Sequence, residues 1–472
     1  MTTGTAPVRM TWVQPEDLLG HEVRQAREDG RGEAAARVWA RWVAAGGGPA
    51  PGSGGASPEP APPALRALAL DLLDELDAVP SPLQPDEPDH LPDPTALPGR
   101  RGLPAVPARR EDAGAYEELV ARLEAAWLGR AVGCVLGKPV EKVGLDGVRA
   151  LARAAGNWPL DDWFTARGVP AEVLAAHPWN RRSAATSLAE NLDGTPEDDD
   201  LDYALLNLLL LQRHGKDFTT ADVARLWLDE LPAGRAFTAE RIAYRNLLLG
   251  LEPPLTARHR NPFREWIGAL IRADVHGWTN PGDPARAAAQ ACRDAALTHT
   301  AAGVHAAAFA AAALAAAAGG DGDVHTALRA GLAVVPSRSR LAEAVRSGID
   351  AAERAPAGPA GFDTVVDRLH ACYGHYHWVH AVPNTALLAA ALTHADGDFT
   401  GSVCRAVSGG WDTDSNGATA GSLAGLLAGS PARIPERWTA PLKNRLATTV
   451  AGFDGIGFDT LAHLTAQEAA RS

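Results

Sequence analysis

Two groups of acidic residues lie more than two hundred residues apart, and each group stands where a helix is expected to begin. The first is Glu197-Asp198-Asp199-Asp200-x-Asp202, and the second is Asp412-Thr413-Asp414-Ser415-Asn416-Gly417. Carboxylates about 4 Å apart repel each other by about 4 kcal/mol at an effective dielectric constant of about 20, so a gathering of five or six requires a cation. Hard oxygen ligands favour magnesium, manganese or calcium. The sequence therefore predicts that the two groups form one metal site.

The first group also has a purely structural explanation. Gly194-Thr195-Pro196 breaks the chain and the apolar run Tyr203–Leu211 follows, so the acids should occupy the first turn of a buried helix. Acidic side chains there complement the positive end of the helix dipole, and a run of them is typical of a solvated surface. One or two acids are enough for capping, however, and this segment has five.

The second group resembles the start of an EF-hand calcium loop, but the glutamate that ends such a loop is replaced by Leu423. The residues after Gly417 are small and apolar, as in a core helix. The preceding Gly409-Gly410-Trp411 predicts a tight loop that presents Asp412 and Asp414 at a helix start.

Two expected helices carry glycine at every fourth position. One has Gly129, Gly133 and Gly137, and the other has Gly417, Gly421 and Gly425. Such bare faces allow close approach of two backbones. The trios indicate tight helix packing in general, or more specifically a crossing of these two helices that brings Glu141 toward Asp412 and Asp414.

The elements that must position these residues are nearly all helical. Apolar residues recur at helical spacing from Asp112 onward and alternating strand patterns are nearly absent, which predicts an all-α, orthogonally packed domain of about ten or more helices over residues 112–472. Residues 1–111 form an extension, with helical patterns over 10–45 and 64–78. Its Gly/Pro-rich stretches, Gly46–Pro63 and Val79–Pro107, predict flexible linkers and partial disorder.

Composition narrows the class of protein. The formal charge is -13 and no stripe of Lys and Arg is present, which argues against a nucleic-acid partner. The four cysteines show no C-x-x-C spacing, as expected of free thiols in a reducing compartment. No signal-peptide pattern opens the chain, and the alanine-rich segment 306–318 is too short to span a bilayer, so we expect a cytoplasmic protein without a membrane partner.

The motifs, taken in order, resemble those of the ADP-ribosylglycohydrolase family, which contains the dinitrogenase reductase-activating glycohydrolase. Gly133–Glu141 is similar to the family's G-x-x-x-G-x-P-x-E, Glu197–Asp200 falls on its T-D-D-T, and Gly409–Ser415 falls on its G-G-D-T-D-[TS] with Trp411 added. Shorter similarities cover Gly268–Arg272 with Gly277, Thr298-His299, and Gly331–Pro336 with Ser339–Leu341. The resemblance spans roughly residues 115–465.

The resemblance implies an all-α fold with two divalent cations, Mg²⁺ or Mn²⁺, at the bottom of an ADP-ribose cleft. Carried over residue by residue, it implies as metal ligands Glu197, Asp198, Asp199, Asp412, Asp414 and Ser415. Glu141 matches the family glutamate near the scissile bond, and with Asp199 and Asp414 it completes the candidate catalytic set. Glu197 and Asp200 stand where the family has threonine, so this site carries more negative charge.

Candidate substrate-binding residues are fewer and rest on weaker patterns. Asn261-Pro262-Phe263 predicts a helix N-cap that attracts the diphosphate, or an ordinary helix start, and Arg264 and Arg272 follow it. Gly268 lies in the same segment. The resemblance implies that His299 lies at the pocket edge. Trp411, like Trp278 and Tyr203, is expected either to stack on adenine or close over the ribose, or to belong to the core. The stretch His375–His380 allows a transition-metal site, which the oxygen-rich site makes unnecessary.

We therefore expect an enzyme, a metal-dependent glycohydrolase that releases ADP-ribose from a modified protein side chain or a small molecule. Cleavage at ribose passes through an oxocarbenium-like state, and cations with a nearby carboxylate suit that chemistry. One alternative is a glycohydrolase acting on a nucleoside-like or nicotinamide-nucleotide-like metabolite. Another is a non-catalytic ADP-ribose-binding module, which the retention of Glu141 and both acidic groups disfavours.

Overall fold

The computed structural model describes residues 8–52, 55–89, 91, 113–320 and 322–471. All regular secondary structure in these residues is helical, and strand-like pairing is limited to three isolated bridges. The expected all-α fold is confirmed. The expected boundary near Asp112 and most of the expected linker 79–107 fall outside the described residues, so the division into an extension and a body stays a prediction.

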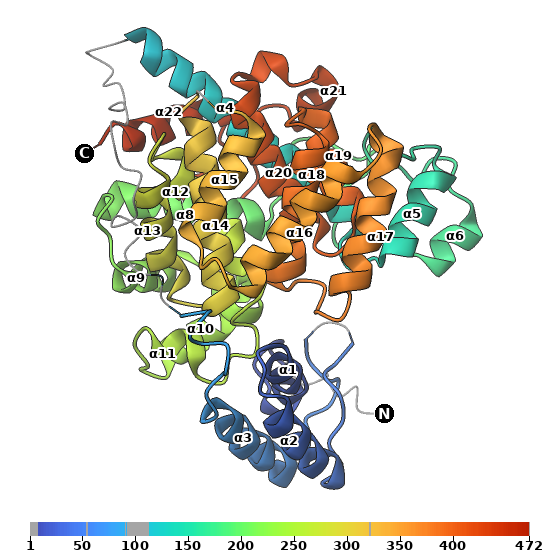
Figure 1. The fold of residues 1–472 in the computed structure, drawn as a ribbon, viewed down its shortest axis with the longest axis vertical. Coiled ribbons are helices and arrows are strands. Elements are labelled where there is room, and N and C mark those ends of the chain that lie inside the picture. Colours follow the sequence, from blue (N-terminus) through green and yellow to red (C-terminus); the bar gives the residue numbers. More distant parts are fainter. Residues whose placement is uncertain (1–7, 53–54, 90, 92–112, 321, 472) are drawn as a thin grey trace, which may run out of the picture.

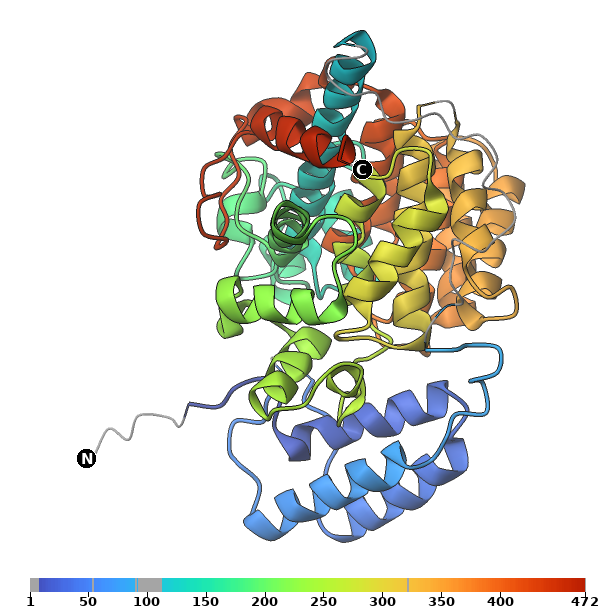
Figure 2. The same cartoon turned by 90° about the vertical axis from the view of Figure 1, so that its left-hand side faces the viewer.

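The described part of the extension folds into three helices, which lie beneath the body in Figures 1 and 2. They are α1 (Pro15–Glu28), α2 (Gly32–Ala44) and α3 (Pro63–Asp77). Each buries one apolar face, with Leu18, Val38 and Leu72 nearly inaccessible to solvent. The sequence predicted helical pattern over 10–45, which the structure divides into two helices at residues 29–31, and a single helix over 64–78.

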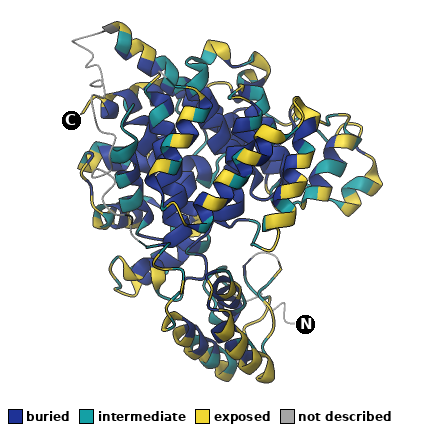
Figure 3. Ribbon diagram, viewed as in Figure 1, coloured by how far each residue is buried: buried dark blue, intermediate teal, exposed yellow. Residues whose placement is uncertain are grey.

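The body contains the remaining helices, which cross one another at many angles around a buried centre (Figures 1 and 3). Its α-helices are α4 (Ala113–Gly137), α5 (Leu145–Ala154), α6 (Ala171–Ala176), α7 (Ala184–Ser187), α8 (Asp199–His214), α9 (Thr220–Glu230), α10 (Thr238–Leu248), α11 (Leu255–Arg258), α12 (Asp274–Trp278), α13 (Pro284–Ala295), α14 (Ala301–Ala318), α15 (Val324–Val334), α16 (Arg340–Arg354), α17 (Phe362–Tyr373), α18 (Ala381–His394), α19 (Phe399–Ser408), α20 (Thr413–Ala428), α21 (Glu436–Thr439) and α22 (Phe458–Ala469). Short 3-10 turns join them at Lys138–Val140, Ala233–Arg235, Ile267–Arg272, Pro359–Gly361, Pro431–Arg433 and Ala440–Leu442.

Helix α14 is the most apolar element and lies at the centre of the body. Its 18 residues are long and apolar enough to cross a membrane by composition alone, but 94% of them are buried inside the protein. Small alanine side chains let neighbouring helices approach it from every side. Its hydrophobicity is therefore accounted for by its place in the core.

Helices α4 and α20 run antiparallel in close contact along their glycine faces. A Cβ atom added to Gly133 would lie 1.8 Å from the carbonyl oxygen of Gly417, and one added to Gly129 would lie 2.0 Å from that of Gly421. At the end of the pair, the Thr413 hydroxyl donates to the Gly137 carbonyl at 2.9 Å. The predicted crossing of these two helices is confirmed, and it places the end of α4 beside the start of α20.

The three-helix extension is joined to the body by aromatic rings and by buried charges. Trp12 packs edge-on against Phe263, with ring centroids 5.5 Å apart. A set of paired acids and arginines with little exposure also links the two parts, and we call it the arginine network: Glu22, Asp29, Arg31, Glu87, Arg264, Glu265 and Arg340. Interdigitated rings and paired charges of this kind fix the extension against the body.

Candidate metal centre and active site

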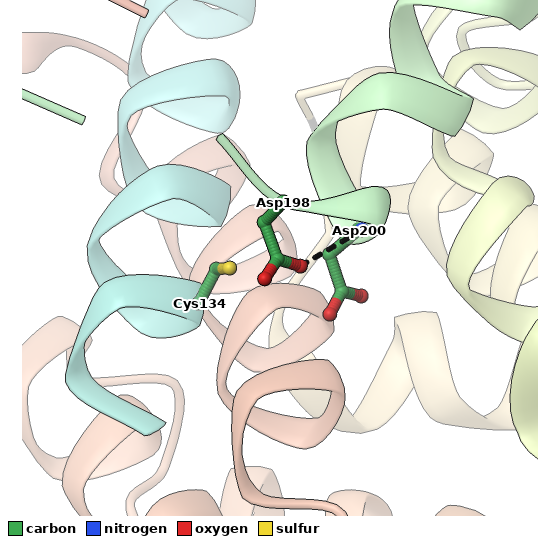
Figure 4. Close-up of side chains that lie close together, drawn as sticks. All are labelled: Cys134, Asp198 and Asp200. Atoms are coloured by element: carbon green, nitrogen blue, oxygen red, sulfur yellow. Dashed lines mark hydrogen bonds between the residues drawn. The ribbon is translucent and has the colours of Figure 1, made fainter. Parts of the chain in front are cut away.

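The first acidic group lies where the sequence predicts, at the beginning of α8. Asp198 is the N-cap residue, and its carboxylate accepts a hydrogen bond from the Asp200 backbone N–H at 3.0 Å (Figure 4). Beyond the first turn the helix is almost entirely buried, because Tyr203–Leu208 are apolar or amide-bearing residues that face the core. The helix start thus holds several carboxylates at the end of a rigid, buried element.

The second acidic group follows a tight loop. Gly410 and Trp411 both have positive φ, +73° and +56°, and Trp411 adopts this rare conformation with its ring stacked on His370 at 4.0 Å. The Asn384 side-chain oxygen accepts hydrogen bonds from the Asp412 backbone N–H at 3.1 Å and from the Asn416 amide at 2.7 Å. These contacts fix Asp412 and Asp414, each 6% exposed, at the start of α20.

Glu141 stands at the end of the turn that follows α4. The Asn180 amide donates to one of its carboxylate oxygens at 2.7 Å, and the Lys142 ammonium lies 2.7 Å from the other. Burial, followed by the negative charge of Glu141, raises the pKa of Asp414 to about 8. Glu141 therefore lies within electrostatic reach of the second acidic group, as the crossing of the two glycine-rich helices implies.

Two cations that the sequence analysis did not assign to the site enter the cluster from α4 and the turn after it. The Lys138 ammonium contacts the Asp198 carboxylate and donates to the Glu197 carbonyl at 3.0 Å. Arg130 is fully buried, lies 3.4 Å from the Asp200 carboxylate and pairs with Asp274 at 2.8 Å. Burial alone would raise the pKa of Asp198, but the nearby Lys138 holds this pKa below its usual value.

The remaining acids of the first group have other partners. The Glu197 carboxylate pairs with Arg235 at 3.0 Å. Asp202 accepts hydrogen bonds from the hydroxyls of Thr448 and Thr449, the latter at 2.6 Å. The hydroxyl of Ser415, a predicted ligand, donates to Asp200 at 3.3 Å.

Three carboxylates have neither an ion-pair partner nor a hydroxyl donor among the described residues: Asp199, Asp412 and Asp414. Asp412 and Asp414 share a hydrogen bond with each other. Burial, followed by neighbouring carboxylates, raises the pKa of both Asp199 and Asp412 well above the usual value. The Oδ1 atom of Asp414 is buried and has no hydrogen-bond partner. These carboxylates repel one another, and one of their oxygen atoms lacks a hydrogen bond. Both features fit the binding of a hard divalent cation, which prefers oxygen ligands.

A second, mixed group combines Cys134 of α4 with Asp198 and Asp200 (Figure 4). Their potential ligand atoms lie within 4.8 Å of one another. Lys138 and Arg130 already contact the two carboxylates, and burial, followed by the charge of Asp198, raises the pKa of the Cys134 thiol well above its usual value. Two cations thus already lie beside this group, although burial, followed by the charge of Asp198, still raises the pKa of Asp200 well above its usual value. With these cations and a protonated thiol, it is the weaker candidate for a hard divalent cation.

The residues assigned to the diphosphate lie in a different environment from the one expected. No helix begins at Asn261, because residues 262–265 form turns that lead into a 3-10 helix, so the expected N-cap is wrong. The Asn261 amide donates to the carbonyls of Ala257 and Thr298, each at 2.8 Å. Arg264 pairs with Glu22 and Asp29 of the extension.

Gly268, Arg272 and His299 belong to one buried group. Arg272 pairs with Glu240 at 2.7 Å and with Asp294 at 3.0 Å, and a Cβ atom on Gly268 would lie 2.2 Å from the Glu240 carboxylate. His299 is 1% exposed, and its Nδ1 atom lies 2.6 Å from the Thr298 hydroxyl. His299 is thus a buried residue, and its expected place at the pocket edge stays a prediction. A role in substrate binding for these residues, and for Trp411, stays a prediction.

The sequence analysis missed Lys138, Arg130, Asn180 and Asn384. One signal was available for Lys138: it is one of only four lysines in the chain, and it stands between a helix-ending glycine and Pro139. Asn384 carried no local signal, because it reaches the second acidic group from a helix that precedes it by about thirty residues.

The comparisons with known proteins concern the body. The family model for ADP-ribosylglycohydrolase matches residues 115–469, well over half of the chain. No curated protein sequence matches the chain. A solved structure described as an "ADP-ribosylglycohydrolase-related protein complex" is similar with a TM-score of 0.44 and 22% identity, covering 75% of this chain and 99% of that one. The family match agrees with the motif resemblance over nearly the same residues, and the chain belongs to the ADP-ribosylglycohydrolase family.

Proposed function

We propose that the protein hydrolyses a glycosidic bond to ADP-ribose with the help of bound Mg²⁺ or Mn²⁺. Family membership supports glycosidic hydrolysis of this type in general. The observation that carries the proposal is that Asp199 and Asp412, which have no ion-pair partner among the described residues, each lie within electrostatic reach of Asp414 and Glu141, and that Asp414 keeps a buried oxygen atom without a hydrogen bond. A fold that had no use for a cation there would gain stability by replacing them.

Asp199, Asp412 and Asp414 are the residues we assign to the cation. A divalent ion held by these carboxylates would supply positive charge to orient ribose hydroxyls and a water molecule. Asp199 is only half-buried, so it is the member of the set that solvent and substrate reach most readily. The stiffness of the two helix starts keeps these carboxylates in place during the reaction.

Glu141 is the residue we assign to proton transfer. In hydrolysis the carbon–heteroatom bond to ribose breaks, the attacking water gives its oxygen to ribose, and a proton reaches the leaving group. A carboxylate beside the reacting carbon can accept the proton from water or pass it to the leaving atom. Asn180 and Lys142 hold the two oxygens of Glu141, which orients the carboxylate.

An ADP-ribosylated protein side chain or small molecule as substrate, and the cytoplasm as compartment, belong to the same proposal. The net charge of -13 supports a substrate that is neither nucleic acid nor membrane.

A product assay tests the proposal. The protein is incubated with ADP-ribosyl-arginine, ADP-ribosyl-serine and O-acetyl-ADP-ribose, in Mg²⁺ or Mn²⁺ and in excess EDTA, and released ADP-ribose is quantified. We expect metal-dependent release from one of the three and a loss of about a hundredfold or more in the Glu141→Gln variant.

The matched control is Glu436→Gln, which changes a first-turn glutamate of α21 outside the site and should leave the rate unchanged. Release that persists in EDTA would contradict the metal requirement. No release from any of the three, despite bound metal, would favour a nucleoside-like substrate or a binding module.

A further inference from the structure

Lys138 places a permanent positive charge inside the acidic site. Its side chain is 7% exposed, contacts the Asp198 carboxylate and donates to the carbonyl of Glu197 at 3.0 Å. It follows directly after Gly137, the last residue of α4, in a 3-10 turn that contains Pro139. The backbone just before Lys138 lies against the start of α20, because a Cβ atom on Gly137 would meet the Thr413 carbonyl and the Asp414 N–H.

The contacts of the eight site carboxylates show where charge is balanced. Asp198 contacts Lys138, Asp200 lies near Arg130, Glu197 pairs with Arg235 and Glu141 pairs with Lys142. Asp202 takes two hydroxyl donors. Asp199, Asp412 and Asp414 alone lack both an ion pair and a hydroxyl donor among the described residues. Asp412 shares a hydrogen bond with Asp414, and the Oδ1 atom of Asp414 is buried without any hydrogen bond. Three such carboxylates match the needs of one divalent ion far better than those of two divalent ions.

We propose that Lys138 acts as a built-in cation in this site, so that the protein binds one divalent ion, on Asp199, Asp412 and Asp414, instead of two. The inference rests on the metal dependence in the proposed function and specifies its stoichiometry. A second ion would have to share Asp198 with an ammonium group that already contacts its carboxylate. At such close range, like charges repel by several kcal/mol at an effective dielectric constant of about 20.

The group formed by Cys134, Asp198 and Asp200 is the alternative place for an ion, and its chemistry differs. Binding there would require the buried thiol to lose its proton and Lys138 to move away from Asp198. A thiolate ligand would also select softer metals than the oxygen set does. The two positions can therefore be distinguished by spectroscopy as well as by the number of ions bound per chain.

The experiment counts Mn²⁺ ions bound to the full-length protein, by calorimetric titration and by the free-Mn²⁺ signal in electron paramagnetic resonance. We expect one ion per wild-type chain and two per chain in Lys138→Met, which keeps the length of the side chain and removes its charge. Lys443→Met is the matched control, since it removes a lysine paired with Asp193 on the surface, and it should bind one ion.

Two further measurements keep the test independent of how well Lys138→Met folds. In the wild-type background, Asp198→Asn should still bind one ion, whereas Asp414→Asn should bind none. Titration with Co²⁺ should give no thiolate-to-metal charge-transfer absorption. Each variant is first compared with the wild type by circular dichroism and thermal unfolding.

The outcomes separate this inference from the proposed function. Two ions per wild-type chain would overturn the inference and leave a metal-dependent hydrolase intact. A single ion in Lys138→Met would overturn the role of the lysine, and a Co²⁺–thiolate band would move the ion to Cys134. No bound Mn²⁺ in the wild type would overturn both the inference and the metal dependence.

Discussion

The acidic site and the arginine network are both buried groups of charges, and they are built in opposite ways. In the arginine network, Glu22 and Asp29 pair with Arg31 and Arg264, while Glu87 and Glu265 pair with Arg340. In the acidic site, Asp199, Asp412 and Asp414 have no such partner among the described residues. The first arrangement joins two parts of the chain, and the second crowds together carboxyl groups whose ionisation is costly without a cation.

The difference shows how to separate structural from functional charges within one protein. A buried ion pair contributes little net stability compared with an apolar replacement, but removing one member leaves an uncompensated charge. Mutation of the arginine network should therefore lower stability. An excess of like charges destabilises the metal-free fold, so mutation of the acidic site should raise stability and abolish function.

The largest effect is expected from Asp414→Asn. It removes a charge from the three unpartnered carboxylates, so Mn²⁺ affinity should fall by more than the roughly 10–100-fold typical of changes in the outer shell of a metal site. The midpoint of thermal unfolding of the metal-free protein should rise, because repulsion among the carboxylates decreases. Calorimetric titration and thermal unfolding in EDTA measure the two quantities. A fall in both the Mn²⁺ affinity and the unfolding midpoint would show that Asp414 stabilises the fold, as the charges of the arginine network do.

In the arginine network, Arg264→Met should destabilise the protein by about 3 kcal/mol, because Glu22 and Asp29 keep only Arg31 as a partner. Urea unfolding measures the change. Arg260→Met is the matched control: Arg260 also joins the body to the extension, through Asp74, but its pair is exposed to solvent and should contribute about 1 kcal/mol or less. Equal effects of the two substitutions would contradict the distinction between a buried and an exposed ion pair.

Gly133→Ala tests whether helix contact, and not charge alone, assembles the acidic site. The added methyl group would lie 1.8 Å from the Gly417 carbonyl, so α4 and α20 must separate, at a cost of about 1–3 kcal/mol. Glu141 and Lys138 would then move away from Asp414, and Mn²⁺ affinity should fall although no charge has changed. Gly144→Ala, where an added Cβ meets nothing within 4 Å, is the control.

A pH-dependent effect is expected at the edge of the arginine network. Burial, followed by the charge of Glu265, raises the pKa of Glu28 to about 8, while Arg24 and Arg340 act in the opposite direction and Asp29 adds to the increase. The unfolded chain loses this proton near pH 4.5, so stability should fall as pH rises from about 4.5 to about 8, by at most about 1.4 kcal/mol per pH unit. His380 also faces Glu28, at 3.8 Å, and burial lowers its pKa.

Thermal unfolding of the wild type and of Glu28→Gln over this pH range measures the effect. The glutamine variant should show a flatter dependence, since it remains neutral throughout. Parallel curves for the two proteins would show that Glu28 is ionised in the folded state.

Local patterns predicted a large part of the fold and of the site. Helical periodicity, the chain break at Gly194–Pro196 and the loop Gly409–Trp411 were enough to predict the helix starts that carry the two acidic groups. The fourfold glycine spacing predicted the contact between α4 and α20, because only a bare face permits such an approach. The diphosphate-binding helix start at Asn261 was wrong, since the segment instead forms turns that satisfy buried carbonyls.

The sequence by itself determined the helical class, the family and the identity of the acidic residues, because these depend on periodicity and on motifs that are short along the chain. Only the tertiary structure decided which of those acids have a positively charged partner. Lys138 reaches Asp198 across 60 residues of chain and Arg130 reaches Asp200 across 70, and neither pairing has a local signature. Charge balance depends on distances in space, and the packing of α4 against α8 and α20 sets those distances.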